Sequence, residues 1–165
     1  MISIRKLEAA DWPAVERIYL EGIATGQATF QTEAPAWADW DKSHLADLSF
    51  VAVAEGGDVA GWVALSPVSS RCVYAGVAEV SVYVAADFRG QQVGSRLLTH
   101  LIASSEQANI WTLQAGIFPE NEASVKLHQK LGFRIVGLRE RVAKHHGVWR
   151  DVYLLERRSQ AVGVD

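Results

Sequence analysis

Cysteine is nearly absent from this 165-residue sequence, in which Cys72 is the one thiol. A single cysteine excludes an internal disulfide and any zinc site built from clustered cysteines. No stretch reaches the ~20 apolar residues that a membrane-spanning helix needs, and the first residues lack the apolar segment of a signal peptide. The charge is nearly balanced as well, since 16 basic residues stand against 19 acidic ones. We therefore expect a cytoplasmic protein that binds no membrane and, judged by its charge, no nucleic acid.

The length and composition point to one globular domain. Chains divide into domains of roughly 150 residues, and 49% of this sequence is hydrophobic against 21% charged. No internal repeat, low-complexity segment or linker interrupts the chain. We expect one domain over residues 1–158 and a short tail at residues 159–165, of which residues 160–165 are expected to be frayed.

Hydrophobic patterning predicts a mixed α/β fold with a central sheet and flanking helices. Helical spacing predicts one helix that Asp11 caps, one that Pro35 opens, and two more at residues 90–106 and 121–131. Almost every residue of the run VAEVSVYV at 77–84 is apolar, so we expect a central strand buried on both faces. Alternation or short apolar runs predict the remaining strands at residues 2–7, 50–55, 59–65, 110–117, 133–138 and 151–155.

The turn after residue 84 is a candidate phosphate site. A strand runs there into a turn that contains Gly90, and an amphipathic helix with Gly94 follows. The first turn of a helix leaves backbone N–H groups unpaired and its dipole favours an anion, while Arg89 and Arg96 add positive charge. The segment is neither a Walker loop, which needs Lys-Ser/Thr, nor the three-glycine dinucleotide fingerprint. An ordinary strand–helix connection is the alternative.

Glu79 is the strongest candidate for acid–base chemistry. It lies inside the apolar strand, where burial of a carboxylate is costly or raises its pKa. A carboxylate with a raised pKa suits a general base that takes a proton from an ammonium group. Period two places Glu79, Ser81 and Tyr83 on one strand face. The alternative is a glutamate at a strand end, exposed to solvent or paired with an arginine.

Further polar candidates carry weaker signals. His128 falls on a predicted helix, where a histidine is more often a surface or satisfied core residue than a catalyst. Asn121 suits a helix N-cap. Arg71 lies in a loop at residues 66–76, from which a guanidinium could hold a substrate carboxylate or simply remain solvated. Aromatic side chains that pack in the core, line a dimer contact or wall a substrate pocket are Phe30, Trp37, Tyr74 and Trp149.

Two other signals are set aside. Cys72 has no base in its neighbourhood of the sequence that would activate it as a nucleophile. His145 and His146 are adjacent, and neighbours on a strand point to opposite faces, so we expect no shared metal ion.

The motifs together resemble the GCN5-related N-acetyltransferase (GNAT) superfamily. Its pyrophosphate motif R-x-x-G-x-G/A is similar to RGQQVG at residues 89–94, and its next helix motif is similar to NEASVKLHQKLGF at residues 121–133. The segments GQATFQTEAP, SPVSSRCVYAGVAEVSVYV and HHGVWRDVYLLE resemble the phosphinothricin and methionine sulfoximine acetyltransferase branch. The resemblance spans residues 2–158.

The resemblance implies acetyl-CoA as cosubstrate, with no metal. The acetyl-CoA would lie in a V between splayed parallel strands at residues 77–84 and 110–117. Its pyrophosphate would rest on amides of residues 91–96, and its pantetheine would pair with Val82 and Val84. The implied cofactor-binding residues are Val82, Tyr83, Val84, Arg89, Gln91, Gln92, Val93, Gly94, Ser95, Arg96, Asn121 and Ser124.

The resemblance also assigns the chemistry. Glu79 would be the general base, His128 a general acid or a contact to the acetyl group, and a backbone N–H near Val82 would stabilise the oxyanion. The acceptor would be a small amino acid or analogue such as phosphinothricin or methionine sulfoximine, with arsinothricin as a close competitor, and the enzyme a homodimer. The implied substrate-binding residues are Phe30, Ser69, Ser70, Arg71, Glu79, Val80 and Ser81.

One departure from the motif concerns Gln92, which stands where the family has its first glycine. Phosphate binding is expected to persist if Gln92 keeps a negative φ. Two alternative functions stay open: an acyl-CoA-sensing module without catalysis, and an acetyltransferase that acts on protein N-termini. A closed pocket would favour the small acceptor, and an open groove would favour a protein N-terminus.

Overall fold

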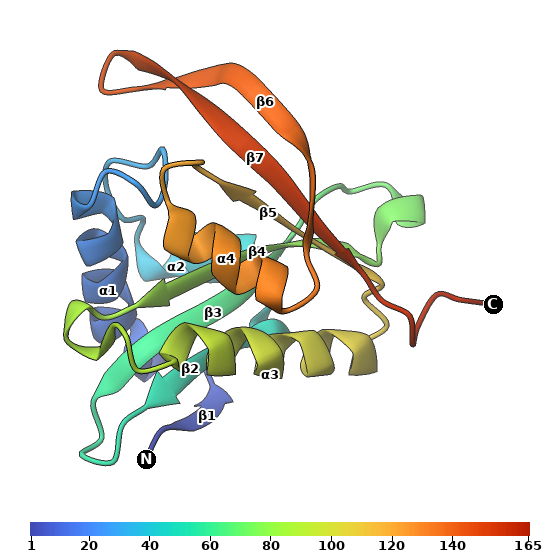
Figure 1. Cartoon of the computed structure of the whole chain (residues 1–165). Helices are drawn as coiled ribbons and strands as arrows, with labels where there is room; N and C mark the ends of the chain where they lie inside the picture. The colour runs from blue at the N-terminus through green and yellow to red at the C-terminus, as the bar shows by residue number, and fades with distance from the viewer.

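The computed structural model describes all 165 residues, and it is built around a seven-stranded sheet with the order β1-β2-β3-β4-β5-β7-β6 (Figure 1). Neighbouring strands are antiparallel except β4 and β5, which are parallel. The predicted mixed central sheet is therefore confirmed. The strands are β1 (Ser3–Lys6), β2 (Ser49–Val53), β3 (Val59–Pro67), β4 (Val77–Val84), β5 (Thr112–Ile117), β6 (Arg134–His145) and β7 (Val148–Arg158).

Helices cover both faces of the sheet. One core cluster joins the sheet to α3 and α4 and includes Leu97, Leu101 and Val80. The other joins it to α1 and α2 and includes Ile18, Trp40 and Trp62. In Figure 1, α3 and α4 lie in front of the sheet. The helices are α1 (Trp12–Ala24), α2 (Trp37–Ser43), α3 (Val93–Gln107) and α4 (Glu122–Lys130).

The two parallel strands separate after three residue pairs. β4 pairs with β5 at Val77–Thr112, Ala78–Leu113 and Glu79–Gln114, and no pair follows. The β5-facing edge of β4 beyond Glu79 is therefore left without a strand partner, which gives the predicted V. An open strand edge of this kind can accept an extended ligand through its backbone.

The expectation that β4 is buried on both faces is wrong. Alternate residues Ala78 and Val80 are buried in the core, whereas Glu79 is exposed. The separation of β4 from β5 is the physical reason, since it opens a cavity that residues 79–83 of β4 line. Period two holds, because Glu79, Ser81 and Tyr83 do lie on one face.

The last hairpin is much longer than predicted. β6 and β7 extend over 12 and 11 residues, and their far ends form an arm that projects beyond the rest of the molecule (Figure 1). Most of the side chains of β6 are exposed, so its sequence lacks the apolar alternation that reveals a half-buried strand.

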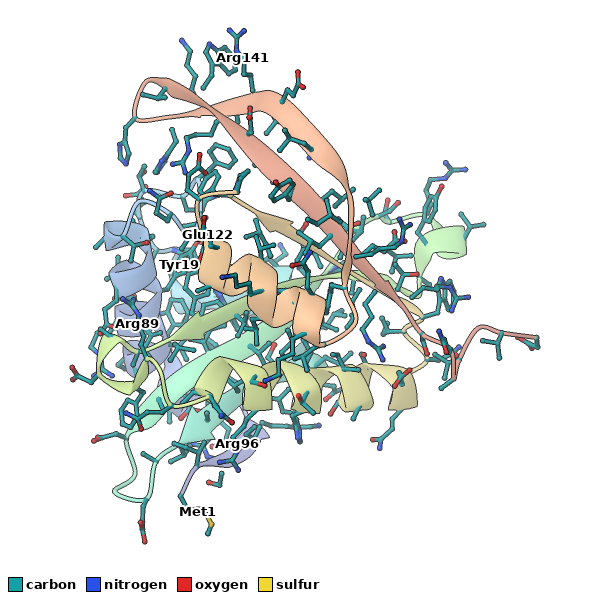
Figure 2. All side chains as sticks on the ribbon, viewed as in Figure 1. Met1, Tyr19, Arg89, Arg96, Glu122 and Arg141 are labelled. Atoms are coloured by element: carbon teal, nitrogen blue, oxygen red, sulfur yellow. The ribbon has the colours of Figure 1, made fainter.

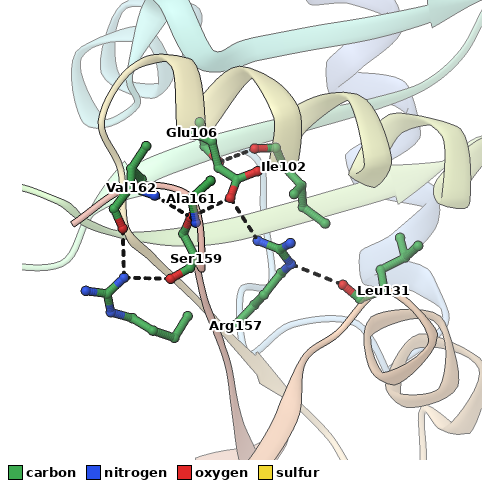
Figure 3. Close-up of polar contacts among 9 residues, drawn as sticks. Ile102, Glu106, Leu131, Arg157, Ser159, Ala161 and Val162 are labelled. Atoms are coloured by element: carbon green, nitrogen blue, oxygen red, sulfur yellow. Dashed lines mark hydrogen bonds and ion pairs between the residues drawn. The ribbon is translucent and has the colours of Figure 1, made fainter. Parts of the chain in front are cut away.

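Two local expectations at the chain ends are also corrected. The Asp11 carboxylate does not cap α1; it accepts hydrogen bonds from both Arg5 Nη atoms, each at 2.8 Å, and the Arg5 guanidinium lowers the pKa of Asp11. The expected frayed segment is held at its start, because the amides of Ala161 and Val162 each donate to Ser159 Oγ at 3.1 Å. Ser159 is buried and bonds to Glu106 of α3, beside an ion pair between Glu106 and Arg157 (Figure 3). The helices are all too short or too polar to cross a membrane.

Candidate active site

A cavity of about 460 Å³ lies in the fork between β4 and β5, and we call it the fork cavity. Its walls come from β4, β5, α4, β6 and the loop at residues 28–31. Phe30 lines it from the loop side and packs edge-to-face on Phe118, with ring centroids 4.9 Å apart. The ionisable side chains in its lining are Glu79, Tyr83, His128 and Arg139.

Glu79 lies in the fork cavity with an exposed carboxylate, so the predicted burial is wrong. Its Oε1 atom accepts a hydrogen bond of 3.2 Å from Nε2 of Gln114, the residue opposite it in β5. Exposure to the cavity leaves the other oxygen free to accept a proton from a ligand or through a water. The position therefore fits a general base although the argument from burial fails.

His128 points into the same cavity from α4 and is only 2% exposed. Its Nδ1 atom lies 2.7 Å from the carbonyl oxygen of Ser124, and a carbonyl only accepts, so Nδ1 carries the proton. Burial lowers the pKa of His128, which keeps the ring neutral at pH 7 with a lone pair on Nε2. This state favours a contact role over that of a resident general acid.

A second cavity of about 460 Å³, the helix cavity, opens in front of the N-terminus of α3. It shares Ala28, Val82, Tyr83, Asn121 and Ser124 with the fork cavity, so the two meet along the open edge of β4. The predicted cofactor residues that line it are Val82, Tyr83, Val84, Arg89, Gln92, Val93, Gly94, Asn121 and Ser124.

The start of α3 presents free backbone donors. The amides of residues 91–95 donate to no acceptor in the chain, whereas the amide of Arg96 bonds to the Gln92 carbonyl oxygen at 3.1 Å. The expected cradle therefore ends at Ser95. The Arg96 side chain is also turned away, because its Nη2 donates to the Ile2 carbonyl oxygen at 2.8 Å, and Figure 2 shows it beside β1.

Gln92 adopts a left-handed conformation with φ of 63°, so the condition of a negative φ is not met. Gly90 has φ of 80° two residues earlier. Positive φ in such a loop turns successive N–H groups toward one concave side, which is the geometry of an anion nest. The left-handed Gln92 thus serves the cradle, and it costs the fold ~1–2 kcal/mol of backbone strain.

The free amides at the start of α3 and the open edge of β4 suit a ligand that has a phosphate at one end and an extended polar chain. Free amides and Arg89 at one end of the helix cavity are suited to bind an anion, and the unpaired edge of β4 continues from there. Asn121 caps α4 as expected, because its Oδ1 accepts from the Ser124 amide at 3.3 Å. These residues fit an acetyl-CoA molecule, whose thioester end would reach the fork cavity.

Arg150 of β7 ties the loop at residues 26–31 to the rest of the site. Its guanidinium donates to the Gly26 carbonyl oxygen at 3.0 Å and to Oε1 of Gln27 at 2.7 Å. It also lies 3.9 Å from the centroid of the Phe118 ring. Arg150 was not among the predicted site residues although it lies in the segment HHGVWRDVYLLE, because its partner Gly26 is 124 positions away in the sequence.

The predicted substrate residues divide into two groups. Phe30, Val80 and Ser81 line the fork cavity together with Glu79. The segment at residues 69–71 does not line it, and the Arg71 guanidinium lies instead 5.7 Å from the Tyr74 ring centroid. The structure thus brings the first group to the site and leaves the second group outside it.

The other predicted aromatic wall residues also lie outside the fork cavity. Trp37 stacks on Trp40, while Tyr74 and Trp149 are exposed. The opposite-face argument for the two histidines is wrong as well, because the rings of His145 and His146 are 4.1 Å apart at the turn of the arm. No cluster of three metal-ligating side chains occurs anywhere in the chain.

Most of the chain matches a known protein family. The model of the acetyltransferase (GNAT) family matches residues 2–133. This chain belongs to the GNAT acetyltransferase family. Its sequence is 35% identical over 159 residues to a phosphinothricin N-acetyltransferase of Streptomyces viridochromogenes, covering 94% of this chain and 87% of that protein. It is 30% identical over 161 residues to an L-methionine sulfoximine/L-methionine sulfone acetyltransferase of Pseudomonas aeruginosa, covering 93% and 92%.

Solved structures agree with this GNAT assignment. A phosphinothricin acetyltransferase from Sinorhizobium meliloti, solved with acetyl-CoA, superposes with a TM-score of 0.85 at 26% identity over 99% of this chain and 96% of that one. A ribosomal-protein-alanine N-acetyltransferase from Brucella melitensis superposes with a TM-score of 0.85 at 28% identity over 95% and 99%. The predicted family branch, fold and acetyl-CoA-dependent N-acetyltransferase class are confirmed.

Proposed function

We propose that this GNAT enzyme moves the acetyl group of acetyl-CoA to the amine of a small amino acid or analogue, of the phosphinothricin or methionine sulfoximine type. The observation that carries the proposal is the meeting of two cavities along the open edge of β4. One fits an extended phosphate-bearing donor, and the other is a small chamber with a carboxylate. The names of the relatives support the same substrate class.

Glu79 is proposed to take the proton from the acceptor ammonium, directly or through a water. The neutral amine then forms a bond to the thioester carbonyl carbon, the carbon–sulfur bond breaks, and the thiolate takes up a proton. A backbone N–H of β4 near Val82 would stabilise the negative charge on the carbonyl oxygen. No covalent enzyme intermediate is needed.

His128 is proposed to contact the reacting groups through Nε2, which accepts hydrogen bonds in the neutral ring. A general acid would first have to gain a proton against the cost of burial. The thiolate would then be protonated by solvent or by the proton that the amine releases. Retention of Glu79 and His128 in one cavity speaks against the sensing module without catalysis.

An acceptor at a protein N-terminus is the second candidate, because the Brucella melitensis relative acts by its name on a ribosomal protein. Such an acceptor needs a groove that admits an extended chain. The fork cavity of about 460 Å³ is lined by Phe30 and by residues of β6 and β7, and it is partly open to solvent. Its volume and its single carboxylate suit a free amino acid, which supports the smaller acceptor.

The experiment is thiol release from acetyl-CoA in the presence of single acceptors, detected with a disulfide reagent. We expect release with L-methionine sulfoximine or L-phosphinothricin at catalytic rates, and little with peptides that carry a free N-terminus. Glu79→Gln serves as the control for background hydrolysis. Release with peptides alone would contradict the proposal and favour the second candidate.

We further propose that the enzyme is a cytoplasmic homodimer. Apolar side chains of the arm stay exposed in the single chain, among them Leu138, Val148 and Trp149, and burying them in a second copy would remove that area from water. The exposed free thiol of Cys72 suits a reducing compartment. Light scattering after size-exclusion chromatography tests the dimer, which Trp149→Glu should weaken.

A further inference from the structure

Arg139 is the one permanently cationic side chain that lines the fork cavity. It lies on β6, and its guanidinium makes no hydrogen bond or ion pair with any residue of the chain. The other charged residue of the lining is the carboxylate Glu79, and the neutral His128 adds no charge. The cavity thus offers one unpaired cation and one anion to whatever binds there.

An irregularity in β6 begins directly after Arg139, whose own partner in β7 is Val152, another residue of the cavity lining. Arg139 pairs with Val152 and Ala143 with Arg150, so three residues of β6 stand opposite one residue of β7. Within this bulge Arg141 has φ of 47°, and its amide donates to Oδ1 of Asp151 at 2.8 Å. The Asp151 carboxylate therefore holds the bulge in place.

The bulge changes which side chains share a face. The extra residues of β6 change the facing of the residues that follow Arg139, among them Val142 and Ala143. Both of them line the fork cavity together with Arg139. Bulges re-aim side chains in this way and are frequent next to active sites. By contrast, Arg141 lies at the far end of the arm and points away from the body (Figure 2).

We propose that Arg139 binds the carboxylate of the acceptor, so that the substrate must be an amino acid with a free carboxylate group. This inference rests on the proposed function. A zwitterion would place its ammonium group at Glu79 and its carboxylate at the guanidinium, which can hold both carboxylate oxygens at once. Arg139 thereby takes the role that the sequence analysis assigned to Arg71, which lies outside the cavity.

The test compares L-methionine sulfoximine with its α-carboxamide, since the pair differs only in the carboxylate. In Arg139→Gln we expect KM for the acid to rise about 10–100-fold, because a charge-assisted hydrogen-bonded pair is lost. We expect kcat to change little. KM for the amide should stay the same. Arg139→Lys, which keeps the charge without the fork, should recover part of the affinity for the acid. Arg141→Gln removes the same charge from a neighbouring position of β6 that points away from the body, and it should behave as wild type.

A binding measurement keeps the test independent of turnover. Calorimetric titration of the N-acetyl acid, the product, into enzyme with CoA should show tight binding to wild type and weak binding to Arg139→Gln. The N-acetyl amide should bind both proteins alike. Equal losses for acid and amide, or an equal effect of Arg71→Gln and Arg139→Gln, would overturn the carboxylate site while leaving the proposed function intact. Failure of wild type to acetylate any amino acid while it acetylates peptides would reject both.

Discussion

Replacing Arg150 by Met should loosen the loop at residues 26–31 without emptying the space that the side chain fills. Methionine keeps an unbranched apolar stem over Phe118 and removes every donor. The loop lines both the fork cavity and the helix cavity, through Ala28. The only hydrogen bonds between this loop and β7 are the two that Arg150 donates to Gly26 and Gln27.

The contacts set the size of the effect. Each bond from the charged guanidinium to the loop is worth ~1–1.5 kcal/mol, at the low end of the range because both acceptors are partly solvated. The cation–π contact with Phe118 at 3.9 Å adds about 1 kcal/mol. The ion pair with Glu120, which is 56% exposed, adds ~0.5 kcal/mol or less. Allowing for water that replaces some of these contacts, we expect Arg150→Met to lower the free energy of unfolding by about 2–3 kcal/mol.

Urea unfolding and steady-state kinetics together test this estimate. The looser loop must be ordered on binding, so KM should rise for both acetyl-CoA and the acceptor, more than kcat falls. Burial and the charges of His146 and Arg150 lower the pKa of His145, so the variant should also raise that pKa in an NMR titration. Arg134→Met is the matched control, since its surface ion pair with Glu156 should cost under about 1 kcal/mol. Unchanged stability with unchanged KM for both substrates would refute the reasoning.

Three further outcomes follow from the site. Glu79→Gln keeps the acceptor for Gln114, so the fold should survive while kcat falls ~10²–10⁴-fold in the thiol-release assay, as expected for loss of a general base. Gln92→Gly removes the strain at φ of 63°, so calorimetry should show acetyl-CoA affinity equal to or above that of wild type. The pKa of His128 is lower in the folded protein than its unfolded value of ~6.5. The contribution of His128 to the free energy of unfolding is therefore fully present above pH ~6.5. Below pH ~6.5 it falls by up to ~1.4 kcal/mol per pH unit. His128→Gln should flatten part of that slope in urea unfolding between pH 7.5 and about 5.5.

Each of these outcomes has a contrary result. Undiminished turnover in Glu79→Gln would remove that carboxylate from the mechanism. A large loss of acetyl-CoA affinity in Gln92→Gly would mean that the glutamine side chain itself holds the ligand. A pH profile identical in wild type and His128→Gln would show that the buried ring does not set the slope.

Sequence alone determined the local features of this protein. The apolar run at residues 77–84 predicted a strand, whose period of two put Glu79, Ser81 and Tyr83 on one face, and the glycine-containing turn before α3 marked the anion cradle. Asn121 was identified as a helix cap from its residue type and position. These features depend on backbone periodicity and on contacts within one or two turns, and such short-range effects are encoded by neighbouring residues.

Only the tertiary structure decided how the site is completed. Glu79 is exposed where two strands separate after the third pair, and Arg139 reaches the cavity because the pairing of β6 with β7 places it opposite Val152. Arg150 reaches a loop 124 residues away. Strand separation, bulges and long-range ties arise when distant segments pack against each other, so no local pattern in the sequence records them. For the same reason, the loop sequence around Arg71 made a substrate contact plausible, although Arg71 lies outside the cavity in the folded chain.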